Sequence, residues 1–524
     1  MGIDFILKDG FIIDGTRDGT PTEADVAVEG DRIKTIGELS GVDAKKTISV
    51  EGLCVCPGFI DAHAHSEFTL LADGRAEGKI HQGVTTEING NCGMSAAPLY
   101  GDALEHRDRE LDELGIKERW NTFDEFFALL EKKKFSPNFV TLTGHGNLRA
   151  SVKGYAEGPL EKAEINRMIE LLKSSLDQGA KGMSTGLIYP PGVYSETSEI
   201  IALAREITDR DGIYTTHMRS EGDRLVESVE EVIKIAHDSG VHAHVSHLKT
   251  SDEKNWNKLN KVFEIIEEAQ KTGLSITCDR YPYIASSTDL DAVLPSWAYE
   301  GGRSKEIDRL KKQRNRLSED IRRAHLDPSS WEKVVISSVN LDTNKWMEGK
   351  SLAEIAASRN QPPLTSLFDL LIEENLMVAA IFFVMNEDNL ISILKKKYTM
   401  IGSDSSARSF DGMTATGKPH PRAFGSFPRI LGRYVKDQGV LSLGEAVHRM
   451  TGLPARTFRL EGRGILAPGY FADITVFDPE TVMDNADYVN PFQRPRGIHH
   501  VFINGSQVLR NAEPTGALPG RVLR

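Results

Sequence analysis

Two histidines, His63 and His65, stand two residues apart at the end of an apolar run that follows Pro57. The alternation of this run is typical of a β-strand, so both imidazoles point to one face while Ile60 and Ala62 point to the other. Two imidazoles on one face of a strand can bind the same metal ion. Taken alone, the pair also fits a solvated strand end, so further ligands are needed to decide.

Four further candidates for metal binding or proton transfer fall at the ends of predicted strands: Cys92, His217, His247 and Asp404. Cys92 follows an apolar strand in a glycine-rich segment, which gives it an open position. A soft thiolate combined with imidazoles is typical of zinc sites. Asp404 could cap a helix, but beside five other strand-end ligands we interpret it as a general acid/base.

The run Val241–His247 also alternates between apolar and polar residues. Period two groups its three apolar residues with His247, which predicts an inner stripe that fills a barrel and ends in a ligand. His242 and His244 would then face the outer helices, and we interpret them as structural.

Two cations, Arg219 and Lys249, each follow a predicted histidine ligand by two residues. If the strands continue, period two places each cation on the same face as its ligand. Lys249 is then either a solvated loop residue or a substrate contact. Arg219 either contacts substrate or forms a salt bridge to Glu221 or Asp223.

The composition is that of an ordinary globular protein: 524 residues, 40% hydrophobic and 27% charged. The net charge of −13 argues against a nucleic-acid surface, which needs a basic face. Four cysteines are too few for a disulfide framework, and Cys54, Cys56 and Cys278 are predicted to be small buried side chains. We find no signal peptide and no apolar run long enough to cross a membrane, so we expect a cytoplasmic protein.

The candidate ligands lie within a region where predicted strands and helices alternate, which is typical of a parallel sheet. Helical stretches include residues 160–178, 196–210 and 226–239. Strand ends are expected at or near the following residues: His65, Asn89, Gly144, Thr185, His217, His247, Tyr281 and Asp404. Eight such strands favour a closed (β/α)₈ barrel, in which catalytic residues lie at the C-terminal strand ends.

The two ends of the chain differ in texture from this barrel. Residues 1–56 and 461–524 contain short strands and Asp-Gly turns, and we expect them to pair into one small β-sandwich. The barrel would then occupy residues 57–460. The gap before its last strand is too long for one crossover helix, so we predict an inserted subdomain at about 286–345.

Several motifs resemble the amidohydrolase superfamily, in which a metal-dependent barrel is joined to a β-sandwich built from both termini. The resemblance begins with the run Pro57–His65 and includes two later strand-end histidines and an aspartate on the last strand. Further motifs resemble the N-acyl-D-amino-acid deacylases, or D-aminoacylases, and span nearly the whole chain: Asn89–Gly93, Tyr214–Glu221, Val245–Lys249, Arg280–Tyr283 and Gly402–Asp404.

The resemblance implies one tight zinc site formed by Cys92, His217 and His247. It also implies a neighbouring site, weakly metallated or empty, formed by His63, His65 and Asp404. Many members of the superfamily bridge two metals with a carboxylated lysine from the fourth strand, but here Gly182–Gly186 follows Lys181 without another lysine. Cys92 takes the place of that lysine, so two fully occupied sites are not expected.

The implied activity is zinc-dependent hydrolysis of the amide bond of N-acyl-D-amino acids, which releases a carboxylate and a free D-amino acid. Asp404 would take a proton from the attacking water and pass it to the departing amine. The resemblance implies Lys249 as a clamp on the substrate's α-carboxylate. It also implies that Tyr189 and Tyr281 contribute to this clamp. Arg219 and Ser287 are further candidates for substrate binding.

The side chain of the D-amino acid is expected to lie against the segment that follows Tyr281. No lysine or arginine occurs between Arg280 and Arg303, and Asp289 and Asp291 would repel a second carboxylate. We therefore predict a neutral, apolar side chain rather than D-glutamate. The alternative is that Arg219, or the loop with Arg408 and Lys418, supplies a cation to this pocket.

Other functions remain as alternatives. A cyclic-amide hydrolase of the hydantoinase or dihydroorotase type shares the His-x-His and the aspartate, but it is disfavoured by the missing lysine and by Cys92. An N-acyl-D-glutamate deacylase and a D-amino-acid dipeptidase are closer rivals. A barrel that has lost catalysis and acts as a scaffold would show gaps among the six ligands, and none is replaced. A small-molecule substrate is the expected partner, and a homo-oligomer is compatible with the sequence.

Overall fold

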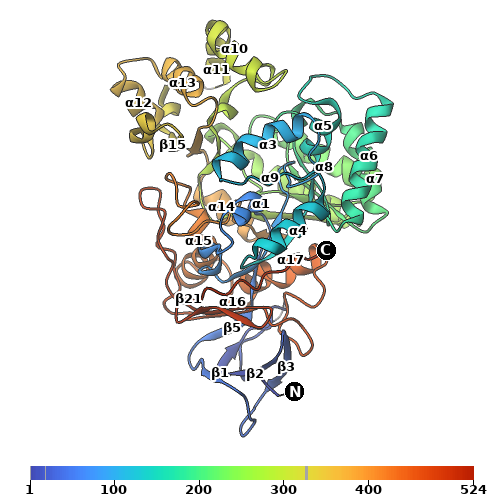
Figure 1. The fold of residues 1–524 in the computed structure, drawn as a ribbon, viewed down its shortest axis with the longest axis vertical. Helices are drawn as coiled ribbons and strands as arrows, with labels where there is room; N and C mark the ends of the chain where they lie inside the picture. The colour runs from blue at the N-terminus through green and yellow to red at the C-terminus, as the bar shows by residue number, and fades with distance from the viewer. Residues whose placement is uncertain (1, 18, 325–327) are drawn as a thin grey trace.

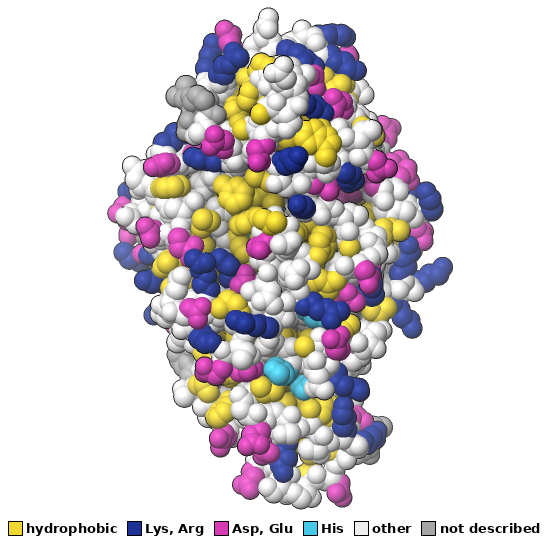
Figure 2. Space-filling model, turned by 90° about the vertical axis from the view of Figure 1, so that its left-hand side faces the viewer, with side chains coloured by type: hydrophobic (Ala, Val, Ile, Leu, Met, Phe, Trp, Pro, Cys, Tyr) yellow, Lys and Arg dark blue, Asp and Glu magenta, His cyan; other side chains and the backbone are white. Residues whose placement is uncertain are grey.

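The structure is a computed structural model that describes residues 2–17, 19–324 and 328–524. Figure 1 shows three parts: a sheet with the N-terminus at the bottom, a barrel with its helices in the centre, and further helices at the top. No helix within the described ranges is long and apolar enough to cross a membrane. Acidic and basic side chains are interspersed on the face shown in Figure 2, so the residues coloured there present no continuous basic surface.

The central part is a barrel with eight parallel strand positions among the described residues. They are β6 (Phe59–Asp61), β7 (Val84–Asn89), β8 with β9 (Asn138–Thr141 and Thr143–Gly144), β10 (Gly182–Gly186), β11 (Ile213–His217), β12 (His242–Val245), β13 (Ile276–Arg280) and β17 (Thr399–Ile401). The ring closes where the amide of Ala62 donates to the carbonyl of Ile401 at 3.2 Å and where Ala64 pairs with Ser405. The predicted (β/α)₈ barrel is confirmed.

Amphipathic helices cover the outside of this barrel. Four of them follow consecutive strands: α6 (Lys162–Asp177), α7 (Thr197–Thr208), α8 (Leu225–Ser239) and α9 (Leu259–Lys271). On α8 the buried residues Leu225, Val229, Val232 and Ala236 recur every three or four positions, which places them on one face against the strands. The helical stretches predicted at 160–178, 196–210 and 226–239 are therefore confirmed.

Further helices lie before α6 and after the insertion. Before α6 these are α1 (Glu67–Ala72), α2 (Glu77–Ile80), α3 (Asp102–Glu113), α4 (Phe123–Lys133) and α5 (His145–Lys153). After the insertion they are α14 (Glu387–Leu394), α15 (Arg422–Arg429), α16 (Leu443–Met450) and α17 (Gly452–Thr457).

Strands from both termini form one nine-stranded sheet within the described residues. They are β1 (Phe5–Ile12), β2 (Thr22–Glu29), β3 (Arg32–Gly37), β4 (Thr47–Ser49), β5 (Cys54–Pro57), β18 (Ile474–Phe477), β19 (Ile498–Ile503), β20 (Ser506–Arg510) and β21 (Glu513–Pro514). The termini meet where β5 pairs antiparallel with β18, with Val55 opposite Val476. The borders proposed from the sequence between this sheet and the barrel stay a prediction.

Alternate residues of β5 pack into different cores. Val55 belongs to the apolar core of the terminal sheet, whereas Cys54 and Cys56 pack with the barrel residue Phe59. This follows from the two-residue period of a strand. The terminal sheet is thereby fixed to the barrel by direct apolar contact.

An inserted unit lies between β13 and β17. It contains a three-stranded antiparallel sheet in the order β14 (Ser286–Asp289), β16 (Ala379–Phe382) and β15 (Val334–Ser338). Its helices are α10 (Arg303–Lys312), α11 (Arg314–Ala324), α12 (Leu352–Ser358) and α13 (Pro363–Glu373). The unit continues to Phe382, beyond the expected end at about 345, because β16 completes the sheet by pairing with both other strands.

Candidate metal centre and active site

The six predicted ligands come together at the carboxyl ends of the barrel strands, beside a cavity of about 1020 Å³. They form two groups of donor atoms, and within each group all donors lie within 4.8 Å of one another. One group is Cys92, His217 and His247, and the other is His63, His65, Cys92 and Asp404. Cys92 is common to both groups, so its sulfur lies between two candidate metal positions.

The distances between donor atoms support this arrangement. The sulfur of Cys92 lies 3.3 Å from Nε2 of His63 and 3.4 Å from Nε2 of His247. Oδ1 of Asp404 lies 3.4 Å from Nε2 of His63 and 3.3 Å from Nε2 of His65. Donors at this spacing can surround a single ion in each group.

Three of these ligands have a left-handed backbone conformation. The φ angles are +54° at Cys92, +37° at His247 and +50° at Asp404. Such angles are uncommon for residues other than glycine and cluster at functional sites, where the surrounding structure holds them in place. Each left-handed residue lies two or three residues beyond the end of its strand, and its side chain contributes a donor atom to one or both of the groups.

The charges around Cys92 suit a metal-binding thiolate. Burial opposes ionisation of this thiol, but the adjacent His63 and His247 outweigh it and lower the pKa of Cys92 well below its ordinary value. The buried His217 makes no hydrogen bond through either ring nitrogen within the described residues. A soft thiolate beside imidazoles with free nitrogens is the donor chemistry that zinc prefers, so the residues present fit such an ion.

The fourth barrel strand supports the Cys92 loop. On β10 the hydroxyl of Ser184 donates to the carbonyl of Gly90 at 2.5 Å and accepts from the amide of Gly93 at 2.9 Å. These two bonds fix the backbone on both sides of Cys92. A serine on this strand therefore positions the cysteine that is shared by the two donor groups.

Behind His63, a buried aspartate links the donor groups to the body of the barrel. Asp279 on β13 contacts Nδ1 of His63 at 3.2 Å and Nε2 of His244 at 2.8 Å. His244 and His242 both contact the hydroxyl of Thr277, at 2.8 and 3.0 Å. An acceptor on Nδ1 fixes the ring of a ligating histidine and directs Nε2 toward a metal.

The prediction that His244 faces the outer helices is wrong. The apolar residues Val241, Ala243 and Val245 are the ones that pack against those helices, and His244 faces the barrel interior. Strand β12 ends at Val245, so the two-residue period does not reach His247. The left-handed backbone at His247 turns its side chain inward independently of the strand.

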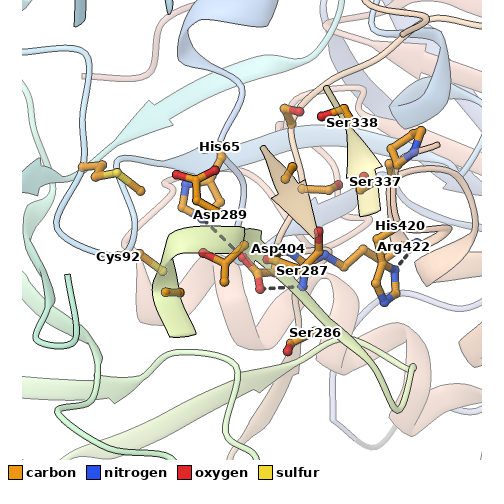
Figure 3. Close-up of a pocket in the computed structure, with 18 of the residues that line it drawn as sticks. His65, Cys92, Ser286, Ser287, Asp289, Ser337, Ser338, Asp404, His420 and Arg422 are labelled. Carbon is orange, nitrogen blue, oxygen red and sulfur yellow. Dashed lines mark hydrogen bonds and ion pairs between the residues drawn. The ribbon is translucent and has the colours of Figure 1, made fainter. Parts of the chain in front are cut away.

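Asp404 is held by a cation that was not predicted from the sequence. Oδ2 of Asp404 lies 2.8 Å from Nη1 of Arg422, at the start of α15. Figure 3 shows Asp404 between His65 and Arg422. Burial opposes ionisation of this carboxyl, but Arg422 and His63 outweigh it and lower its pKa well below the ordinary value. The carboxylate is therefore ionised at neutral pH and can accept a proton.

Lys249 lines the cavity, and its ammonium is paired with Glu221. Its ammonium also lies 2.8 Å from Nδ1 of His247. Glu221 contacts Nδ1 of His247 at 3.0 Å and lies 3.5 Å from Nε2 of His217. Glu221 thus connects two predicted ligands with the predicted carboxylate clamp.

Of the other residues predicted to bind substrate, two line the cavity and one is fully buried. Tyr189 and Ser287 line the cavity, and the tyrosine hydroxyl contacts Thr288 at 3.2 Å. Tyr281 is fully buried beneath Arg422, whose guanidinium lies 4.7 Å from the centre of its ring.

Arg219, for which a substrate contact and a salt bridge were both open from the sequence, is not among the residues that line the cavity. Its guanidinium is paired with Glu231 on α8 at 2.9 Å rather than with either acidic residue named from the sequence. Two backbone carbonyls, those of Val193 and Ser195, hold it further. A guanidinium with all these partners has little capacity left for a substrate.

Sequence comparison places the chain among metal-dependent hydrolases. The profile of the amidohydrolase family matches residues 46–273 and 341–509. A D-aminoacylase from Alcaligenes xylosoxydans xylosoxydans is 37% identical over 521 residues, which cover 99% of this chain and 97% of the relative. The chain therefore belongs to the amidohydrolase family.

Two solved structures show which members of the family the chain resembles in fold. The N-acyl-D-glutamate deacylase from Bordetella bronchiseptica, solved with zinc and a phosphonate mimic of the tetrahedral intermediate, has a TM-score of 0.85 at 34% identity. A D-aminoacylase structure, whose subject is the role of a binuclear metal centre, has a TM-score of 0.84 at 35% identity. Each comparison covers 100% of both chains. Within its family, the chain is thus similar over its full length to deacylases of N-acyl-D-amino acids.

Proposed function

We propose that this protein hydrolyses the amide bond of N-acyl-D-amino acids and releases a carboxylate and a free D-amino acid. The observation that carries this proposal is the pair of donor groups that share Cys92 beside a cavity lined by Lys249 and Arg422. The near full-length similarity to a D-aminoacylase and to an N-acyl-D-glutamate deacylase supports it.

We assign the metal site to zinc, held tightly by Cys92, His217 and His247, with His63, His65 and Asp404 as a second and weaker site. When bound, zinc supplies a Lewis acid that polarises an amide carbonyl and lowers the pKa of water. The residues around it supply the remaining chemistry.

Asp404 is the general base and then the general acid. It is ionised, faces the cavity and is oriented by His65 and Arg422. In this role it takes a proton from the attacking water and delivers it to the amine as the amide bond breaks. Arg422 keeps the carboxylate from rotating out of line.

Lys249 and Arg422 also supply the positive charge that attracts the substrate's α-carboxylate. The charged end of each is already held by a carboxylate, Glu221 for Lys249 and Asp404 for Arg422, so neither cation has to be ordered when substrate binds. A pre-positioned cation contributes more to binding because less conformational entropy is lost. Tyr189 and Ser287 line the same cavity and complete the substrate contacts.

The side chain of the D-amino acid lies against the wall formed by the insertion. This wall carries Ala292, Val293 and Phe382, together with Asp289. The Asp289 side chain is exposed to the cavity, so its carboxylate is ionised at neutral pH. An ionised Asp289 repels an acidic side chain, which favours D-leucine, D-methionine or D-phenylalanine over D-glutamate.

A panel of N-acetyl amino acids tests this proposal. The zinc-loaded protein is expected to hydrolyse N-acetyl-D-leucine faster than N-acetyl-D-glutamate, and both faster than their L-enantiomers. Values of kcat/KM for the four substrates, measured side by side, test both the side-chain preference and the stereochemical preference. Higher activity on N-acetyl-D-glutamate would make the protein an N-acyl-D-glutamate deacylase, and activity on hydantoin or dihydroorotate alone would refute the proposal.

A further inference from the structure

The cations that line the cavity differ in one respect. Five lysines and arginines line it: Arg107, Lys249, Lys345, Arg408 and Arg422. Four of them are paired with carboxylates: Arg107 with Glu110, Lys249 with Glu221, Lys345 with Glu348 and Arg422 with Asp404. Arg408 forms no ion pair with any carboxylate in the described part of the chain. Among the five cations that line the cavity, Arg408 is therefore the one whose charge is not balanced by a carboxylate of the described residues.

The backbone around Arg408 is held in place. Its carbonyl accepts from the amide of Gly78 at 2.7 Å, and the preceding Ala407 donates its amide to the hydroxyl of Ser66 at 2.8 Å. Nη1 of Arg408 donates to the carbonyls of Thr414 and Thr416, both at 3.2 Å. These bonds use one nitrogen of the guanidinium and leave the others for a ligand in the cavity.

The surroundings of Arg408 make an anionic ligand favourable. Burial alone lowers the pKa of Arg408 to about 10, and no carboxylate among the described residues pairs with the guanidinium to oppose this. The guanidinium still carries its charge at neutral pH. A desolvated charge without a partner is unfavourable, so an anion that enters the cavity gains more there than at a solvated arginine.

Arg408 and Asp289 come from different segments of the chain. Asp289 ends β14 of the insertion, which pairs with β16. Arg408 instead follows Asp404 by four residues, on a loop that continues through Thr416. The cavity, at about 1020 Å³, is at the upper end of the usual range of about 300–1000 Å³ for small-molecule sites. It therefore has room for a group larger than acetyl.

We propose that Arg408 forms a subsite for a carboxylate carried by the acyl group of the substrate. The protein would then prefer N-acyl-D-amino acids whose acyl group is a dicarboxylic acid residue, such as succinyl. This inference rests on the proposed function, in which the α-carboxylate binds at Lys249 and Arg422 and the side chain lies against Asp289. The acyl group is the remaining substituent that can face Arg408.

The test compares substrates that differ only in this charge. N-succinyl-D-leucine and N-pentanoyl-D-leucine have acyl chains of similar length, and the same pair is measured with Arg408→Met and with Lys345→Met as a matched control. We expect the wild type to prefer the succinyl substrate by about 10- to 150-fold in kcat/KM, the range for a hydrogen bond to a charged group. Arg408→Met should reduce this ratio to about 1, whereas Lys345→Met should leave it unchanged.

Two results would overturn the assignment. Equal losses on both acyl substrates in Arg408→Met would mean that Arg408 contacts the α-carboxylate or supports the fold. A loss confined to N-acetyl-D-glutamate, measured against N-acetyl-D-glutamine, would place the charge on the amino-acid side chain instead.

Hydrolysis of N-acetyl-D-leucine by the wild type is the separate check on the proposed function. If it is absent, calorimetric titration of the zinc-loaded protein with succinate still tests the subsite. Weaker binding to Arg408→Met than to wild type supports it, and equal binding refutes it.

Discussion

Chemically identical residues occur both at the ends of the barrel strands and lower down in the strand bodies, with different consequences. His63 and His65 form one His-x-His pair at the barrel mouth, and His242 and His244 form another within β12. The second pair is satisfied by Thr277 and by Asp279. Identical spacing therefore does not define a metal site: position along the strand decides whether a donor faces open space or a protein partner.

The cysteines show the same contrast. Cys92 lies just beyond β7 among imidazoles, which lower its pKa despite burial. Cys278 lies within β13, where burial raises its pKa to about 12 and its nearest partner is the hydroxyl of Thr399 at 3.3 Å. A thiolate forms readily at the strand end and is suppressed in the strand body, so metal binding is confined to the former.

The largest effect is expected from Cys92→Ala, which removes the donor shared by both groups. We expect zinc and activity to be lost while the fold is kept, since a metal site needs its full set of ligands. Zinc content by atomic absorption and a circular dichroism spectrum measure the two properties. Cys278→Ala is the matched control and should keep both metal and activity; full zinc content in Cys92→Ala would exclude Cys92 as an essential ligand.

Asp404→Asn should have the next largest effect. The amide occupies the same volume and leaves the tight zinc group intact, but it cannot accept the proton. We expect kcat to fall by about 10²- to 10⁴-fold with little change in KM. Steady-state kinetics on N-acetyl-D-leucine, with zinc content as the control, measure this, and a kcat near that of wild type would contradict the assigned role.

Asp279→Asn tests whether a strand-body residue affects the strand-end site. The substitution keeps the size of the side chain but removes the charge that orients His63. Affinity for the more weakly held metal should fall by about 10- to 100-fold. Equilibrium dialysis with zinc measures it, and Thr277→Val, in the same network but without contact to a predicted ligand, is the control. Equal affinity in Asp279→Asn and wild type would remove Asp279 from the site.

The smallest effect is expected from His242→Gln. Burial lowers the pKa of His242 to about 4, so the folded protein leaves it neutral while the unfolded chain takes up a proton below about 6.5. Wild type should therefore lose stability as the pH falls from 6.5 to 4. His242→Gln should lose less, by at most about 1.4 kcal/mol per pH unit. Urea unfolding at several pH values measures the difference, which vanishes if His242 is protonated in the folded state.

The strand ends of the barrel could be predicted because apolar runs stop where a polar, chemically active residue begins. Cys92, His217 and Asp404 were found in this way. His247 was also found, but for an incorrect reason, since its direction comes from a left-handed backbone and not from strand alternation. A period of two cannot be extended past the last hydrogen-bonded residue of a strand.

The site residues that sequence analysis missed are brought to the site by loops or by contacts with distant segments of the chain. Arg422 lies 18 residues after Asp404, and only the path of the intervening loop brings them together. Glu221 lies only four residues after the end of β11, but its contact with His247 joins two separate loops. Asp279 did carry a signal, because an acidic residue inside an apolar strand requires a buried partner. The extent of the insertion was missed because the pairing of β16 with β14 and β15 is non-local.

The sheet shared by the two termini has a consequence for how the protein is made. Val55 on β5 pairs with Val476 on β18, which is synthesised about 420 residues later. At about 5–20 residues per second, a ribosome needs roughly 20–80 s to deliver that partner. During this interval one edge of β5 is unpaired, and unpaired edges are where chains associate wrongly. We therefore expect this edge of β5 to be open to incorrect association until synthesis reaches the last strands.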